Sequence, residues 1–304
     1  MSGFSSYKEM MHMHSINTTF KKLRTERTIS QADLVKNISN RSTLSSFEQK
    51  GSKISFDLLR RYLHRMNITL EEFEDLIHDE VQFEKKALSK KMLSLYYNND
   101  FENLQTYCAL CEEKYNKNKD FFYYHLYAQY IFILDTKEVI SLSDSKKKDI
   151  QAHIYAYLNK IENWGKFEFS LFINLMYLFD DDYILLILKN IKKYAIAHQT
   201  ITINYQLYSK FMINTFHLFA YRGCLEKIIT ELEFFSKVLN HDNLREKILC
   251  NYFKGIYLAS TSDTTLGLQL IDSTITVFEQ IGFKDYADEL KYSKSIYLDR
   301  NKKP

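Results

Sequence analysis

The four cysteines are the residues whose chemistry is easiest to judge from spacing. Cys108 and Cys111 form a CxxC pattern, which is typical of zinc ligands and of redox-active thiols. A structural zinc site needs a second pair of ligands, and the other cysteines, Cys224 and Cys250, are isolated. The segment around the CxxC has the apolar period of a helix, which favours thiols packed in a core. The sequence therefore predicts no metal site and reduced thiols in a cytoplasmic protein.

The sequence motifs of common enzyme chemistries are absent. The chain contains no GxGxxG, P-loop, GxSxG or HExxH pattern. It has only 7 glycines, which are too few and too scattered to build a phosphate-binding loop. We expect neither an enzymatic activity nor a bound cofactor.

Basic side chains are concentrated in one short part of the chain. Residues 17–66 carry 11 basic and 4 acidic side chains, whereas residues 79–304 carry 29 of each and are neutral. A compact module with a net charge of +7 is typical of a domain that binds a polyanion. The sequence thus indicates a nucleic-acid-binding module of about fifty residues near the N-terminus.

The elements that position these residues are predicted to be helices throughout. The only proline is Pro304, and the low glycine count leaves few tight turns. Within residues 17–76, the apolar spacing and the candidate N-caps Ser30, Asn40 and Thr69 indicate five short helices. We place these helices at residues 18–27, 31–38, 41–49, 56–66 and 70–77.

The second and third of these helices resemble the helix-turn-helix of phage repressors. The residues that carry the resemblance are Ser30-Gln31-x-x-Leu34 and Ser42-Thr43-Leu44-Ser45-x-Phe47-Glu48. In that family the glutamine that opens the second helix contacts phosphate, and the first, second and sixth residues of the third helix read bases. The resemblance therefore implies DNA-binding roles for Gln31, Arg41, Ser42 and Ser46. Thr43, the next residue of the third helix, is also expected to contact DNA.

Arg41 is the strongest candidate for reading a base. Its guanidinium can address O6 and N7 of one guanine at the same time, although a solvated surface arginine remains the alternative. Lys50 and Lys53 lie in or beside the turn that follows and are expected to contact phosphate. Arg24 resembles the family arginine that pairs with the residue corresponding to Glu48, which implies a structural ion pair.

Residues 79–304 are expected to form stacked helical hairpins. Helical segments of similar length alternate with polar breaks such as YNND, LSDS, FDDD and STSD, without a clean tetratricopeptide consensus. Stacked hairpins form a superhelix with an extended concave groove. The predicted fold is all-α: a five-helix phage-repressor-like domain and a right-handed α-superhelix of degenerate TPR-like hairpins. The expected domains are a flexible stretch at 1–16, a DNA-binding domain at 17–78, and a ligand-binding and dimerisation domain at 79–304.

Taken over its whole length, the chain resembles the Rgg/GadR/MutR family of transcriptional regulators. The stretches RSTLSSFEQ, ISFDLLRRYLHRMNITLEEF and IENWGKFE carry this resemblance. It implies a homodimer that binds promoter DNA and whose repeat domain binds a short peptide pheromone or another small ligand. The alternative is a protein-interaction scaffold in which the helix-turn-helix only tethers the chain or has lost DNA binding.

The resemblance also indicates three residues for the peptide-binding groove. Asn174 in SLFINLMYLF and Asn214 in KFMINTFHLF match asparagines that bond a peptide backbone in the family, and Tyr252 is a further match. A carboxamide both donates and accepts, which suits an extended peptide. The alternative for each asparagine is a buried amide that bridges two helices. The chain has no long apolar span or signal-like start, so we expect a cytoplasmic protein without a membrane partner.

Overall fold

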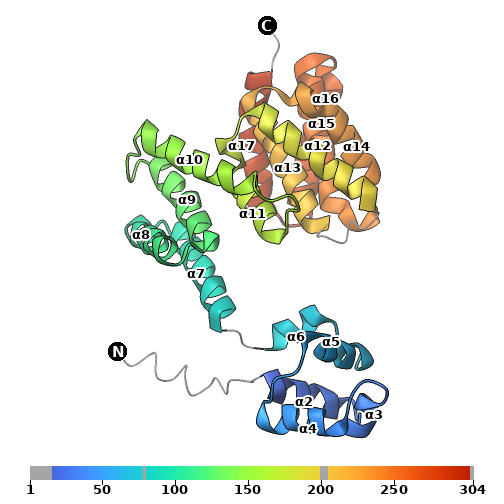
Figure 1. The fold of residues 1–304 in the computed structure, drawn as a ribbon. Coiled ribbons are helices and arrows are strands. Elements are labelled where there is room, and N and C mark those ends of the chain that lie inside the picture. Colours follow the sequence, from blue (N-terminus) through green and yellow to red (C-terminus); the bar gives the residue numbers. More distant parts are fainter. Residues whose placement is uncertain (1–15, 78–79, 199–204, 302–304) are drawn as a thin grey trace. The chain divides into compact units, whose positions relative to one another are not determined.

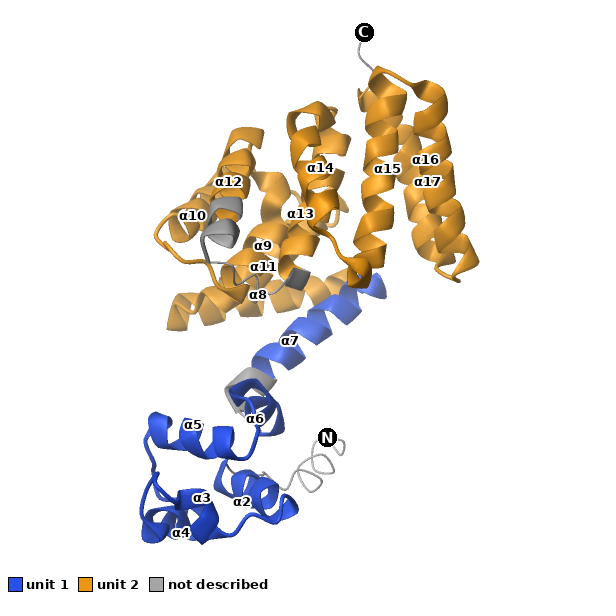
Figure 2. Cartoon of the chain, turned by 90° about the vertical axis from the view of Figure 1, so that its right-hand side faces the viewer, with its two compact units in different colours: residues 1–100 blue, residues 101–304 orange. Residues whose placement is uncertain are grey.

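The computed structural model describes residues 16–77, 80–198 and 205–301, and the regular elements in these ranges are all helices (Figure 1). The predicted all-α fold class is confirmed. The chain divides into two compact units, residues 1–100 (unit 1) and residues 101–304 (unit 2) (Figure 2). Of the N-terminal stretch expected to be flexible, residues 1–15 lie outside the described ranges.

Unit 1 consists of five short helices around a small aromatic core, followed by α7 (Glu80–Tyr97). The ring of Phe20 packs on the rings of Phe47, Tyr62 and Phe73, with centroids 5.3, 5.9 and 6.3 Å away. All four rings are at most 5% exposed, so one cluster fixes the helices against one another. The five helices are α2 (Ile16–Glu26), α3 (Gln31–Val35), α4 (Arg41–Lys50), α5 (Phe56–Arg65) and α6 (Leu70–Leu76).

Side-chain caps mark the starts of these helices. Ser30 accepts a hydrogen bond from the backbone of α3 at 3.1 Å, and Thr69 forms a capping box with Glu72 at the start of α6. Asn40 occupies the N-cap position of α4 without a side-chain hydrogen bond. The cap residues predicted from the sequence therefore stand at the observed helix starts.

With few glycines available, asparagine occupies several left-handed helix ends. Asn37, Asn67 and Asn99 have φ angles of 60°, 56° and 54° at the ends of α3, α5 and α7. Asparagine tolerates this region better than other side chains because its carboxamide bonds locally. Glycine takes this conformation at the C-cap of α4, where the φ angle of Gly51 is 65° and its N–H donates to the carbonyl oxygen of Phe47.

Unit 2 is a stack of helical hairpins. Each of α9, α11, α13 and α15 packs against the next, and these helices form one continuous row. The elements of the unit are α8 (Phe101–Asn118), α9 (Phe121–Thr136), α10 (Asp144–Leu158), α11 (Lys166–Leu175), η1 (Met176–Leu178), α12 (Asp181–His198), α13 (Tyr205–Arg222), η2 (Leu225–Ile228), α14 (Ile229–Val238), η3 (His241–Asn243), α15 (Leu244–Thr261), α16 (Thr264–Gln280) and α17 (Lys284–Asn301).

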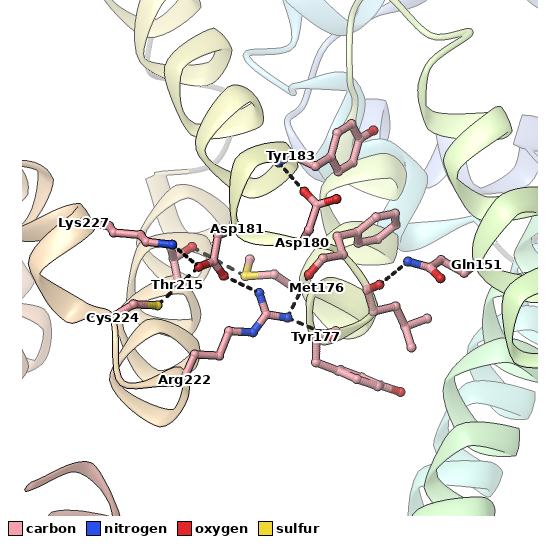
Figure 3. Close-up of polar contacts among 12 residues, drawn as sticks. Gln151, Met176, Tyr177, Asp180, Asp181, Tyr183, Thr215, Arg222, Cys224 and Lys227 are labelled. Carbon is pink, nitrogen blue, oxygen red and sulfur yellow. Dashed lines mark hydrogen bonds and ion pairs between the residues drawn. The ribbon is translucent and has the colours of Figure 1, made fainter. Parts of the chain in front are cut away.

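The turn η1, which follows α11, is held by side chains from other helices (Figure 3). Arg222 at the end of α13 donates to two carbonyl oxygens of this link at 3.1 and 2.8 Å, and Gln151 of α10 donates to a third at 2.5 Å. The same guanidinium pairs with Asp181 at 2.7 Å, which Lys227 also contacts at 2.7 Å. Carbonyls that a broken helix would leave without partners are thereby satisfied.

Helices α15 and α16 approach each other through small residues. A Cβ atom built on Gly267 would lie 2.4 Å from the backbone nitrogen of Ala259, and one on Gly255 would lie 2.7 Å from the carbonyl oxygen of Gly267. Real side chains do not fit at such distances, so only glycine permits this crossing. The two helix backbones are therefore in direct contact.

Candidate functional site

The residues predicted to read DNA lie at the start of α4. Arg41 and Ser42 are the first two residues of this helix, and both are exposed. Thr43 and Ser46 are partly buried, and Ser46 Oγ lies 2.6 Å from the hydroxyl of Ser52 in the turn after the helix. The first two residues of α4 are therefore exposed to solvent, whereas the hydroxyl of Ser46 is hydrogen-bonded within unit 1.

A chain of hydrogen bonds connects the interior of unit 1 to Arg41. Arg24 donates to both carboxylate oxygens of Glu48 at 2.6 and 2.9 Å, and both side chains are almost fully buried. Gln31 donates to the same carboxylate at 2.8 Å and accepts from Arg41 Nε at 3.5 Å. Sequence reasoning pointed to the Arg24–Glu48 pair but missed that Glu48 also orients Gln31, the residue expected to contact phosphate.

Two further arginines of the basic module donate hydrogen bonds to backbone carbonyl oxygens of unit 1. Arg27 donates to the carbonyl oxygens of Leu23 and Met66, both at 3.1 Å. Arg65 donates to carbonyl oxygens at the end of α3, at 3.2 and 3.0 Å from its Nη1. Apart from Leu23, which is four residues from Arg27, these partners are far away in sequence, which is why no local pattern revealed them. Part of the positive charge is thus engaged by backbone carbonyls.

Lys50 and Lys53 remain on the surface. Lys50 is the last residue of α4, Lys53 lies in the turn that follows, and both are exposed. Neither forms an ion pair with any residue that the structure describes. Their ammonium groups are therefore available to an anion outside the protein.

In unit 2, Asn174 of α11 is bonded to helix α9. Its amide nitrogen lies 3.2 Å from Nε2 of His125 and 3.2 Å from the side-chain oxygen of Gln129. Asn174 thus bridges two helices, as the alternative interpretation of this residue expected. Its Oδ1 makes no hydrogen bond with the described residues.

His125 and Gln129 are residues that sequence reasoning missed. They are four positions apart on α9 and so lie on one face of the helix, which is a signal the sequence does contain. The ring of His125 is buried, and burial lowers its pKa to about 4. It is therefore neutral at ordinary pH, and a neutral imidazole has one nitrogen that accepts.

Asn214 lies on α13, the next helix in the row. Its side chain is partly buried and forms no hydrogen bond with any of the described residues. One turn later, His217 packs its ring on Phe253 with centroids 4.7 Å apart and bonds Tyr297 through Nδ1 at 2.9 Å. The structure thus places Asn174 and Asn214 on adjacent helices, with one carboxamide tied to its neighbours and the other without such bonds.

Tyr252 is fully buried between α15 and α17. Its hydroxyl donates to the carbonyl oxygen of Leu290 at 2.8 Å, and burial raises the pKa of the phenol. This side chain does not lie with the two asparagines at an accessible surface. Its assignment to peptide binding stays a prediction.

The CxxC pattern lies inside helix α8. Cys108 and Cys111 are buried, and burial raises the pKa of each thiol to about 12. Such thiols are protonated and pack as small apolar groups. Among the described residues, no three His, Cys, Asp or Glu side chains are grouped to hold a metal ion, and no helix is long and apolar enough to cross a membrane.

The fold matches solved structures of helix-turn-helix transcription regulators. A transcriptional regulator from Listeria monocytogenes EGD-e shares 17% identity at a TM-score of 0.74, and the match covers 96% of this chain and 100% of that one. The SHP pheromone receptor Rgg2 of Streptococcus dysgalactiae shares 20% identity at 0.72, with coverages of 92% and 99%. PrgX in its cCF10 complex shares 18% identity at 0.67, with coverages of 95% and 94%. At these identities the common feature is the fold.

Family membership comes from the sequence itself. The sequence model of the family described as "HTH-type transcriptional regulator Rgg, C-terminal domain" matches residues 104–292, well over half of the chain. The chain therefore belongs to the Rgg family of transcriptional regulators, and the resemblance inferred from the sequence is confirmed. A search of curated protein sequences found no match.

Proposed function

We propose that this chain is a cytoplasmic transcription regulator that binds promoter DNA through unit 1 and senses a short peptide through unit 2. The observation that carries the DNA-binding half is the exposed pair Arg41 and Ser42 at the start of α4. Arg41 is connected by hydrogen bonds through Gln31 to the buried carboxylate of Glu48. A side chain that is already oriented loses less conformational entropy when it contacts the edge of a base. Gln31, Lys50 and Lys53 then contact the phosphates beside it.

Electrophoretic mobility shifts on the gene's own promoter region test this half. The full chain should bind, and its affinity should fall steeply as the salt concentration rises. Arg41→Ala should cost about 1–3 kcal/mol on the promoter site and much less on random DNA. Equal weakening on both would make Arg41 a phosphate contact, and no binding to either DNA would favour the tethering scaffold.

The ligand half of the proposal rests on family membership and on the asparagines of α11 and α13. Rgg2 is described as a pheromone receptor, and PrgX is known in a complex with cCF10. Here Asn174 and Asn214 lie on adjacent helices of the row and keep hydrogen-bonding atoms free. Carboxamides at such places can hold a peptide backbone irrespective of its side chains.

Affinity selection from a pooled library of short synthetic peptides, followed by mass spectrometry, tests this half. An enriched peptide, labelled with a fluorophore, should bind the full chain in polarisation titrations. Asn174→Ala or Asn214→Ala should weaken it by about 1–3 kcal/mol, because a peptide group is left without a partner. Both variants should keep DNA binding in the absence of peptide. If both bind the peptide as tightly as the parent, the two asparagines are structural only.

We further propose that the regulator acts as a homodimer. One recognition helix reads only a few base pairs, and two symmetric half-sites are the usual way to lengthen the target. The last two helices of unit 2 and the turn between them support this proposal, because they expose large apolar side chains, namely Leu266, Ile281, Phe283 and Tyr292.

A further inference from the structure

A three-residue polar cluster joins α9 to α11 at the proposed peptide site. Asn174 places its amide nitrogen 3.2 Å from two possible acceptors, Nε2 of His125 and Oε1 of Gln129. The imidazole is buried at 6% exposure, while Asn174 and Gln129 are partly buried. These contacts are the only hydrogen bonds that the three side chains make with described residues.

The cluster determines which atoms of the Asn174 carboxamide are already engaged in hydrogen bonds. A carboxamide has two N–H groups and one oxygen, and here both N–H groups have an acceptor. Burial keeps His125 neutral by lowering its pKa to about 4, so the ring can hold its proton on Nδ1 and accept at Nε2. Asn174 is partly buried, and its Oδ1 makes no hydrogen bond with described residues.

We propose that His125 and Gln129 are positioning residues that engage both N–H groups of Asn174, so that this asparagine offers a bound peptide an acceptor only. The peptide must then present a backbone N–H at α11. Asn214, whose carboxamide makes no hydrogen bond with described residues, can meet either an N–H or a carbonyl group on α13. This inference rests on the proposed function, because it specifies the chemistry of the peptide that unit 2 would take.

The first test needs no ligand. Full-length protein labelled with ¹⁵N at histidine reports the protonated ring nitrogen through long-range nitrogen–proton correlations. His125→Phe identifies the signal, and His217, which is bonded to Tyr297 and not to the cluster, is the internal control. We expect a neutral His125 with its proton on Nδ1. A proton on Nε2 would mean that Asn174 accepts from the ring and would overturn the proposal.

Two nearly isosteric variants test the same direction independently. Gln129→Glu keeps an acceptor beside Asn174, so the His125 tautomer should not change. Asn174→Asp removes both donors and places a carboxylate against the ring, so the proton affinity of His125 should rise more than tenfold. A tautomer switch in Gln129→Glu, or an unchanged His125 titration in Asn174→Asp, would contradict the proposed hydrogen-bond direction.

The peptide selected as described above tests the functional half. His125→Phe keeps an aromatic ring but removes the acceptor, so affinity should fall about five- to tenfold. Methylation of the peptide's backbone nitrogens, one at a time, should find one position at which binding is lost. The inference would be refuted if His125→Phe bound the peptide with unchanged affinity, or if no methylation of the peptide weakened its binding. Neither result would contradict peptide sensing itself. If no peptide is selected, the proposed function fails even when the tautomer is as expected.

Discussion

At the scale of single residues, unit 1 depends on a buried ion pair whose carboxylate also accepts a hydrogen bond from Gln31, a residue proposed above to contact DNA. Arg24 and Glu48 are almost completely withdrawn from water, so either charge alone would be strongly unfavourable there. Arg24→Ala should therefore lower the free energy of unfolding by about 3–5 kcal/mol, measured by urea denaturation followed by circular dichroism.

The matched control replaces both partners. Arg24→Met combined with Glu48→Met leaves no unpaired charge and should recover most of this loss, while Gln31 loses its acceptor. The double variant should consequently fold well but bind DNA less tightly. A double variant as unstable as the single one would show that packing, and not charge pairing, dominates at this position.

The two buried histidines of unit 2 predict a pH dependence of stability. Burial lowers the pKa of His125 and of His217 to about 4, below the value of about 6.5 expected in the unfolded chain. Between these values the unfolded state binds more protons, so stability is fully present above pH 6.5 and falls as the pH drops towards 4. The loss for each histidine is at most about 3 kcal/mol.

Thermal unfolding of His125→Phe across this range checks the prediction. The variant cannot take up that proton, so its melting temperature should fall less than that of the parent between pH 6.5 and pH 4. His241→Phe is the control, because His241 is exposed and should not alter the slope. Parallel curves for parent and His125→Phe would rule out a buried neutral imidazole.

At the scale of elements, the short turn η1 depends on a side chain from a helix far away in sequence. Arg222 makes three polar contacts there and is largely shielded, whereas Lys227 makes one contact to the same Asp181 and is half exposed. Arg222→Ala should destabilise unit 2 by about 1–3 kcal/mol, and Lys227→Ala by less than about 1 kcal/mol. Chemical denaturation of both variants measures the difference, and equal losses would mean that the carbonyl contacts contribute little.

The helices of unit 1 were predictable because their signals are local. Ser30 and Thr69 mark the starts of α3 and α6, and each bonds a backbone N–H only three residues later. The apolar residues Phe20, Leu44 and Phe47 belong to the core that these helices enclose. The residue type of Asn40 predicts the N-cap position of α4, where its backbone is extended, but it does not predict that the side chain makes no cap bond.

The arrangements in unit 2 were harder to predict because their partners lie far apart in the chain. The sequence reveals that Asn174 is polar on an apolar helix, but not that His125, 49 positions earlier, bonds it. Likewise, the hydroxyl of Tyr252 bonds a carbonyl 38 positions away. Such contacts depend on how the hairpins stack, which helical period alone does not determine.

At the scale of the whole molecule, the exposed apolar residues on the last two helices predict self-association. Ile281 and Phe283 lie in the turn between α16 and α17 and are 56% and 61% exposed. Light scattering of the full chain at micromolar concentration should give the mass of a dimer. Ile281→Glu combined with Phe283→Glu should give a monomer, because the buried interface would hold unpaired charges.

Leu244 provides the control for this experiment. It is 66% exposed on α15, outside the turn, and Leu244→Glu should leave the mass unchanged. A monomeric parent, or a dimer that survives the double substitution, would count against an interface at this place.

The contact between α15 and α16 determines how unit 2 can deform. Most packed helices contact each other through a layer of interlocking side chains, and shear motions are small displacements of one helix along that layer. Gly255 and Gly267 bring the two backbones together without such a layer, so we expect α15 and α16 to move together as one rigid pair. If a peptide bound as proposed above displaced α11 and α13, we would expect the displacement to reach α15 and α16 as a rigid-body motion.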